Sequence, residues 1–176
     1  KVGDSREVIT CNGSLLQAVI GDIMRTVPGG FAHHKTMMPS YTMDGALEEM
    51  DRYEEDGELL GQLEAGYNQI GTLGGGNHFI ELQEDDDGYL AVMIHSGSRH
   101  FGKSVCDYFH YKARQLNQKW FSAVPDEYRL AFLPVDTREG KQYLNWMQLS
   151  MDFDKENRDK MMLAVKAILE KWSGKY

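Results

Sequence analysis

Apolar residues recur every three or four positions in four stretches of the chain, and this spacing predicts helices. The first stretch follows Ser14 and ends at Pro28, and residues 31–41 beyond it have no clear period. The second covers residues 43–70, is rich in acidic side chains and contains Gly57 as an expected break. The third and fourth cover residues 104–121 and 141–172, so helices are expected to make up most of the protein.

Between the second and third of these stretches the pattern changes to that of strands. Residues 78–83 and 89–94 are short apolar runs, and the acidic segment that separates them ends in Gly88. This arrangement predicts an antiparallel hairpin with a polar turn. We expect an α+β fold in which this hairpin, or a small mixed sheet, carries the functional site and several helices cover it. Residues 1–176 are expected to form one domain or an internal part of one.

Composition and charge narrow the class of protein. The formal net charge of −8 argues against a protein that binds polyanions over its whole surface, although a local basic patch remains open. No apolar stretch approaches the roughly 20 residues that span a bilayer, and the first residues do not form a signal peptide. Cys11 and Cys106 form neither a disulfide framework nor a C-x-x-C metal pair. We therefore expect a cytoplasmic protein with no membrane partner.

Two histidine segments bounded by glycines carry most of the functional information. They are Gly71-Thr-Leu-Gly-Gly-Gly-Asn77-His78-Phe-Ile-Glu81 and His95-Ser-Gly-Ser-Arg99-His-Phe-Gly102. His78 is expected to begin the first strand of the hairpin and His95 to end the second, which places both imidazoles at the end away from the acidic turn. Imidazole is a common metal ligand, but a single histidine of this kind is more often a hydrogen-bonded structural residue. The glycines before Asn77 lack the Gly-Lys-Ser/Thr of a P-loop, so we expect them to permit tight backbone packing.

In these two segments the chain resembles the RtcB-type RNA ligases, whose signature sequences occur here in the same order. A late segment, Asn157-Arg158-Asp159-x-Met161-Met162, also resembles the helix that follows the second motif in that family. The resemblance implies an incomplete RtcB-like domain. It also implies a ligase that uses GTP and two Mn²⁺ ions to join RNA ending in a 2′,3′-cyclic phosphate or 3′-phosphate to RNA with a 5′-hydroxyl. Its partners would be tRNA halves or broken RNA, and no DNA is expected.

The resemblance also implies roles for individual residues. His78 and His95 would each bind one Mn²⁺ ion, and Asn77 would lie against the reacting phosphate as a catalytic and nucleotide-binding residue. Glu81 would contact the guanine nucleotide, and Arg99 would hold a phosphate of RNA or nucleotide with its planar guanidinium.

Several motifs of the family do not occur in this chain. They are an Asp-x-Gly-Cys-Gly segment that supplies a bridging cysteine, a His-His-Asn segment that supplies a third metal histidine, and the His-Gly-Ala-Gly-Arg segment of the guanylylated histidine. We therefore expect this polypeptide alone to be inactive as a ligase and to supply metal and phosphate contacts only. Two alternatives remain open: a truncated, noncatalytic homologue that binds RNA or metal, and a structural domain whose histidines are relics.

Overall fold

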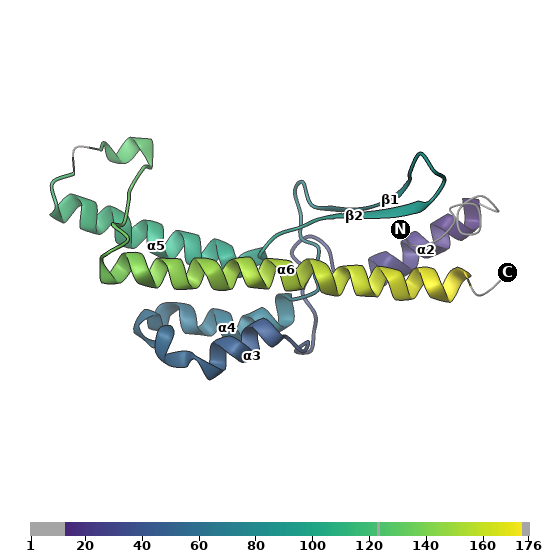
Figure 1. Ribbon diagram of the computed structural model, residues 1–176, viewed down its shortest axis with the longest axis horizontal. Helices are drawn as coiled ribbons and strands as arrows, with labels where there is room; N and C mark the ends of the chain where they lie inside the picture. Colours follow the sequence, from purple (N-terminus) through teal and green to yellow (C-terminus); the bar gives the residue numbers. More distant parts are fainter. Residues whose placement is uncertain (1–12, 123, 174–176) are drawn as a thin grey trace. The chain divides into compact units, whose positions relative to one another are not determined.

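The structure is a computed structural model that describes residues 13–122 and 124–173 (Figure 1). Cys11 lies outside the described residues. The elements in chain order are α2 (Gly13–Thr26), α3 (Tyr41–Glu48), the 3-10 helices η1 (Met50–Arg52) and η2 (Glu54–Asp56), α4 (Gly57–Gln69), β1 (Phe79–Glu84), β2 (Leu90–His95), α5 (Arg99–Lys119), η3 (Asp126–Tyr128) and α6 (Arg138–Ser173). β1 and β2 pair as an antiparallel hairpin, which confirms the α+β fold class.

The elements fall into two compact units, and each is described by itself. Unit 1 holds the described residues up to Met38, Asn68–Gly97, and the residues from Asp154 onward. Unit 2 holds Pro39–Tyr67 and Ser98–Phe153. The long helix α6 therefore contributes its first part to unit 2 and its second part to unit 1.

In unit 1 the hairpin packs one of its two faces on helices. Because side chains alternate along a strand, Ile80 and Leu82 of β1 lie on one face and Phe79 and Glu81 on the other. The first face contacts a core formed by α2, β2 and the second part of α6, in which apolar burial is the main stabilising term. The buried members of this core are Val19, Ile23, Leu90, Val165, Ile168 and Leu169. The second face of the hairpin is left toward solvent, with Phe79 and Glu81 exposed.

The core of unit 2 is largely aromatic. Trp146 of α6 is fully buried, and its ring lies edge-on to Tyr53 with centroids 4.9 Å apart. Phe101 of α5 lies beside Phe153 of α6 at 5.3 Å between centroids. Edge-on and tilted arrangements of this kind are the ones that aromatic rings prefer.

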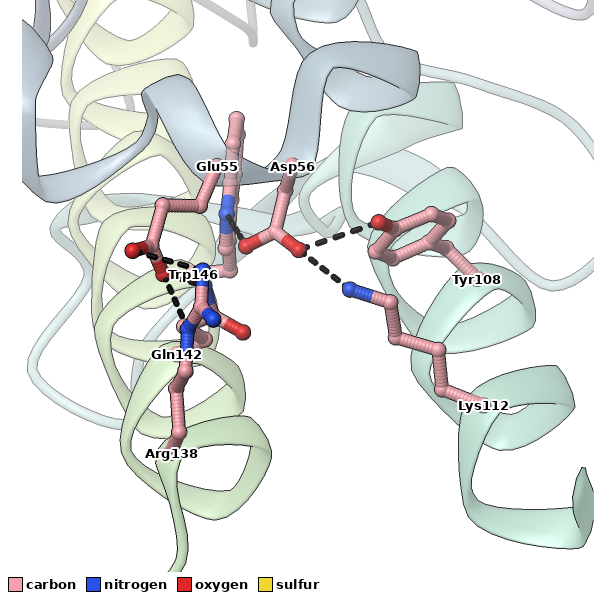
Figure 2. Close-up of polar contacts among 7 residues, drawn as sticks. All are labelled: Glu55, Asp56, Tyr108, Lys112, Arg138, Gln142 and Trp146. Carbon is pink, nitrogen blue, oxygen red and sulfur yellow. Dashed lines mark hydrogen bonds and ion pairs between the residues drawn. The ribbon is translucent and has the colours of Figure 1, made fainter. Parts of the chain in front are cut away.

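A buried carboxylate organises the polar interior of unit 2 (Figure 2). Asp56 is fully buried and accepts hydrogen bonds from the Trp146 indole at 2.9 Å, the Lys112 ammonium at 2.6 Å and the Tyr108 hydroxyl at 3.0 Å. Burial alone would lower the pKa of Lys112, but its hydrogen bonds to Asp56 and Tyr108 outweigh burial and raise that pKa. A charge buried in this way is tolerated because it is both paired and hydrogen-bonded.

Several boundaries differ from those expected from the sequence, and two of the differences have a clear physical reason. The break in the acidic segment precedes Gly57, which begins α4, and consists of the two 3-10 helices η1 and η2. These short turns end on Asp56, whose buried hydrogen bonds override local helical propensity. Helix α5 begins at Arg99, five residues earlier than expected, because Phe101 already belongs to the buried face that continues at Val105.

Candidate functional site

The glycine run before Asn77 packs tightly against the backbone that follows α2, and the tight packing, though not its partner, was predicted from the sequence. Gly74 and Gly76 have φ angles of +98° and +73°, which favour glycine. The Gly30 amide donates to the Gly74 carbonyl at 2.8 Å. A Cβ added at Gly75 would lie 3.4 Å from the Cα of Gly30. The run therefore allows two backbone segments of unit 1 to approach closely, just before the candidate site residues.

The exposed face of the hairpin brings together two of the candidate residues. Phe79 of β1 lies directly opposite His95 of β2, and Glu81 lies opposite Met93. Directly opposite residues in an antiparallel pair share a face, so Glu81 and His95 lie on the same side of the hairpin. All four side chains are exposed. This face therefore presents a carboxylate and an imidazole, with two apolar side chains, to any bound ligand.

The rings of His78 and His95 lie beside each other in unit 1. Their centroids are 5.8 Å apart and their planes are inclined by 38°. This confirms the prediction that the two imidazoles converge at the end of the hairpin away from its turn. His78 does not begin the first strand, however, because β1 starts at Phe79. Side chains alternate along a strand, so a strand residue at position 78 would point to the face opposite His95. Because His78 lies outside β1, its ring can lie beside that of His95.

A carboxylate that the sequence analysis did not single out lies close to His78. The Cβ position built on Gly97 is 3.9 Å from Nε2 of His78 and 4.0 Å from Oδ1 of Asp154. Asp154 lies on α6 and forms an ion pair with Arg158 one helical turn later. The sequence did not indicate this carboxylate for two reasons. Asp154 is far from His78 along the chain, and its spacing from Arg158 is that of an ordinary ion pair on a helix surface.

Two of the donor types that Mn²⁺ accepts are therefore near each other, imidazole and carboxylate. Within residues 13–122 and 124–173, however, no group of three or more histidine, cysteine, aspartate or glutamate side chains is arranged to hold a metal ion. The described residues fit part of a coordination shell rather than all of it. Further ligands would have to come from elsewhere.

The remaining candidates take different positions. Asn77 is exposed at the end of the glycine run, in unit 1. Arg99 belongs to unit 2, where it is the first residue of α5 rather than part of a loop. Its φ of +56° is rare for a residue with a side chain, and burial lowers the pKa of its guanidinium. An unfavourable backbone conformation of this kind is often found at functional sites.

A cavity of about 480 Å³ lies in unit 1 between α2 and β1. Its lining is mostly apolar and includes Ile20, Met24 and Leu73, together with Glu81 of β1. Cavities that bind small molecules have volumes of roughly 300–1,000 Å³. Glu81 borders this cavity from β1, but its side chain lies on the exposed face of the hairpin.

The site thus combines two imidazoles and a carboxylate, donor types that metal ions accept, with glycine-rich backbone that allows close approach. Comparison with known proteins gives the family. Residues 14–176 match the family described as tRNA-splicing ligase RtcB, and the chain belongs to it. None of the described helices combines the length and apolar character that a bilayer-spanning segment needs.

Individual relatives agree with this assignment. The chain is 30% identical over 153 residues to an RNA-splicing ligase RtcB of Mycobacterium bovis, an alignment that covers 74% of this chain and 35% of the relative. It is 31% identical to the tRNA-splicing ligase RtcB of Archaeoglobus fulgidus, covering 74% and 32%. For the Thermococcus kodakarensis protein of the same name the values are 26% identity, 81% and 38%. The chain thus spans about a third of the length of these curated relatives.

Proposed function

We propose that this polypeptide is part of a GTP- and Mn²⁺-dependent RNA ligase that joins 2′,3′-cyclic phosphate or 3′-phosphate ends to 5′-hydroxyl ends. The observation that carries the proposal is the pairing of His78 and His95 on the hairpin of a chain that belongs to the RtcB family. Each imidazole supplies one ligand to one of two Mn²⁺ ions. Bound Mn²⁺ would neutralise negative charge on the transferring phosphates.

The other candidate residues contact nucleotide and RNA in this proposal. Asn77 has an amide that donates to a phosphate oxygen, and its exposed position at the end of the glycine run leaves room for the phosphate. Glu81 accepts hydrogen bonds from the guanine base, and the exposure of its side chain on the same face as His95 supports this role. Arg99 holds a phosphate through two parallel N–H donors.

The polypeptide by itself supplies no nucleophile in this proposal. Transfer of a nucleotide through a histidine requires a free ring nitrogen lone pair, and metal coordination occupies that lone pair in His78 and His95. The other histidines do not occur in the family's nucleophile motif. We therefore propose that the chain binds metal and phosphate and that ligation requires further RtcB sequence.

Calorimetric titration with Mn²⁺ tests the metal role directly. We expect weak binding that is lost in His78→Ala and in His95→Ala. His100→Ala and His110→Ala are matched controls, because they remove the same side chain from helix α5, and they should bind like the wild type. Equal binding by all four variants would contradict the metal assignment, and tight binding would show that the described donors suffice.

Incubation with α-labelled GTP, Mn²⁺ and RNA tests the statement that the chain by itself supplies no nucleophile. No covalent label is expected on the chain alone, whereas a label lost in His100→Ala or His110→Ala would contradict the assigned roles. A noncatalytic homologue would bind RNA or Mn²⁺ whether or not the gene encodes the missing RtcB motifs, and a structural domain would bind neither. Sequencing the gene on both sides distinguishes these cases, because the proposal requires the Asp-x-Gly-Cys-Gly and His-Gly-Ala-Gly-Arg segments there.

A further inference from the structure

The side chain of Asn157 joins the two histidine segments of unit 1. It is fully buried on α6. Its Oδ1 accepts a hydrogen bond from the Thr72 amide at 3.0 Å, and its Nδ2 lies 3.1 Å from the Thr72 carbonyl. The same Nδ2 donates to the Gly97 carbonyl at 3.1 Å and lies 3.3 Å from the Ser96 hydroxyl. One amide thus contacts the backbone before His78 and the backbone after His95.

The two hydrogen bonds between the Asn157 side chain and Thr72 satisfy the backbone N–H and C=O of Thr72, as a neighbouring strand would in a sheet. A buried backbone N–H and C=O each need a partner, and a side-chain amide offers one acceptor and two donors in a single plane. Thr72 is itself fully buried, so water does not supply these partners. Aspartate has no donor and would place a negative charge against two carbonyl oxygens.

Two further contacts fix these segments, one between the segments and one to α6. The Ser96 hydroxyl donates to the Leu73 carbonyl at 2.7 Å. The Arg158 guanidinium, next to Asn157 on α6, donates to the Ser96 carbonyl at 3.3 Å. The backbone on both sides of the histidine pair is therefore fixed against the same turn of one helix.

The two histidines differ in how much they depend on these contacts. His95 lies within β2, where the register with Phe79 fixes its position. His78 precedes β1, so the hairpin ladder does not fix its backbone. Its position depends on the glycine run, and glycines hold a single conformation only when neighbouring groups constrain them.

We propose that Asn157 is a positioning residue, which sets the placement of His78 relative to His95 by holding Thr72 and Gly97 together. The inference concerns the geometry of the two rings and requires no bound metal. Its consequence for metal affinity rests on the proposed function. Residues that orient metal ligands without touching the metal typically change affinity by about 10–100-fold when mutated.

The test uses the full chain with ¹³C-labelled histidine and compares wild type, Asn157→Asp and Asn145→Asp. Asn145 is the matched control, a partly exposed asparagine on the same helix. Circular dichroism first establishes that each variant is folded at the temperature used. In the wild type we expect a nuclear Overhauser effect between ring protons of His78 and His95, without metal. Asn157→Asp should lose that effect, and Asn145→Asp should keep it.

Titration with Mn²⁺ alone then separates this inference from the proposed function. Asn157→Asp should bind Mn²⁺ about tenfold more weakly than wild type. If wild type does not bind Mn²⁺ but the ring-to-ring effect still depends on Asn157, the metal role fails and the positioning role stands. If folded Asn157→Asp keeps the wild-type effect between the rings, the positioning role is wrong, whatever the metal result.

A second variant covers the case in which Asn157→Asp does not fold. Ser96→Ala removes the hydroxyl that contacts both Asn157 and the Leu73 carbonyl, with a smaller perturbation of the interior. We expect it to weaken the same ring-to-ring effect. A purely structural role would lower thermal stability and leave the geometry of the rings in the folded protein unchanged, so an unaltered effect in Ser96→Ala would also overturn the proposal.

Discussion

The ring of Phe79 stacks on the ring of His95 across the hairpin, with centroids 5.4 Å apart and planes inclined by 24°. His95 therefore has an aromatic neighbour on its own strand pair as well as the imidazole of His78. Because Phe79 is exposed, this stacking does little for the core, and its main effect is to limit the orientations that His95 can adopt.

Substitution Phe79→Ala should release the His95 ring. Cross-strand pairs contribute roughly 0.2–1 kcal/mol, so the loss of stability should be small. The ring protons of His95 should move downfield in the NMR spectrum, because they lose the shielding of the phenyl ring. Met93→Ala, on the same exposed face, is the control and should leave the His95 signals in place. Identical His95 shifts in both variants would show that the stacking does not persist in solution.

Replacing Asp56 by asparagine should destabilise the chain strongly. The change leaves the Lys112 ammonium without its carboxylate partner in a largely buried site, and breaking a buried pair costs about 3–5 kcal/mol. Urea unfolding at neutral pH measures the difference.

The neighbouring carboxylate provides a matched control for Asp56. Glu55 binds Arg138 and Gln142 but is 44% exposed, and surface ion pairs contribute only about 0–1 kcal/mol (Figure 2). Glu55→Gln removes the same charge one residue away and should have a small effect. Equal losses in the two variants would mean that burial does not decide the contribution of Asp56.

The contribution of Asp22 to stability should depend on pH. Hydrogen bonds from Arg25, Lys171 and Trp172 hold the pKa of Asp22 well below its ordinary value of 3.8. A depressed folded-state pKa gives stability that is complete above the unfolded-state pKa and is lost as the pH falls toward the folded-state pKa. Asp22→Asn should therefore lower the urea midpoint at neutral pH, and its difference from wild type should shrink steadily as the pH falls below 3.8.

Asp159→Asn is the control for this pH dependence, because Asp159 is an exposed aspartate on α6. It should stay within about 0.5 kcal/mol of wild type at each pH, as surface substitutions usually do. A difference between Asp22→Asn and wild type that stays constant from neutral to strongly acidic pH would contradict the prediction.

The sequence predicted the elements of this fold better than their boundaries. The spacing of Val105, Phe109 and Ala113 predicted helix α5, but its start was placed too late because Phe101 was assigned to the histidine segment that ends at Gly102. The hairpin was predicted with both strands one residue too early. Local patterns could not place the break before Gly57, since it depends on partners of Asp56 that are far away in the sequence.

Prediction of the candidate site shows the same division between local and distant contacts. Hairpin geometry placed His78 and His95 at the same end of the hairpin, away from its turn. The convergence of their rings also requires that His78 precede β1, which the sequence did not predict. Asp154 and Asn157 could not be placed beside them from spacing, since both follow the hairpin by more than fifty residues. Only packing of the second part of α6 in unit 1 brings the Asn157 amide to Thr72 and Gly97.

The backbone at Arg99 should favour glycine over alanine. Its φ of +56° lies in the left-handed region, where a Cβ costs about 1–2 kcal/mol. Arg99→Gly and Arg99→Ala both remove the guanidinium and the packing of its stem, so the difference between them isolates the backbone. We expect the glycine variant to be more stable than the alanine variant by about 1 kcal/mol.

His100 is the matched control at the next position of the same helix. Its backbone lies outside the left-handed region, so His100→Gly should be less stable than His100→Ala by about 0.5–1 kcal/mol. Thermal unfolding of the four variants gives both differences, and the same sign at the two positions would show that Arg99 is not held in this conformation.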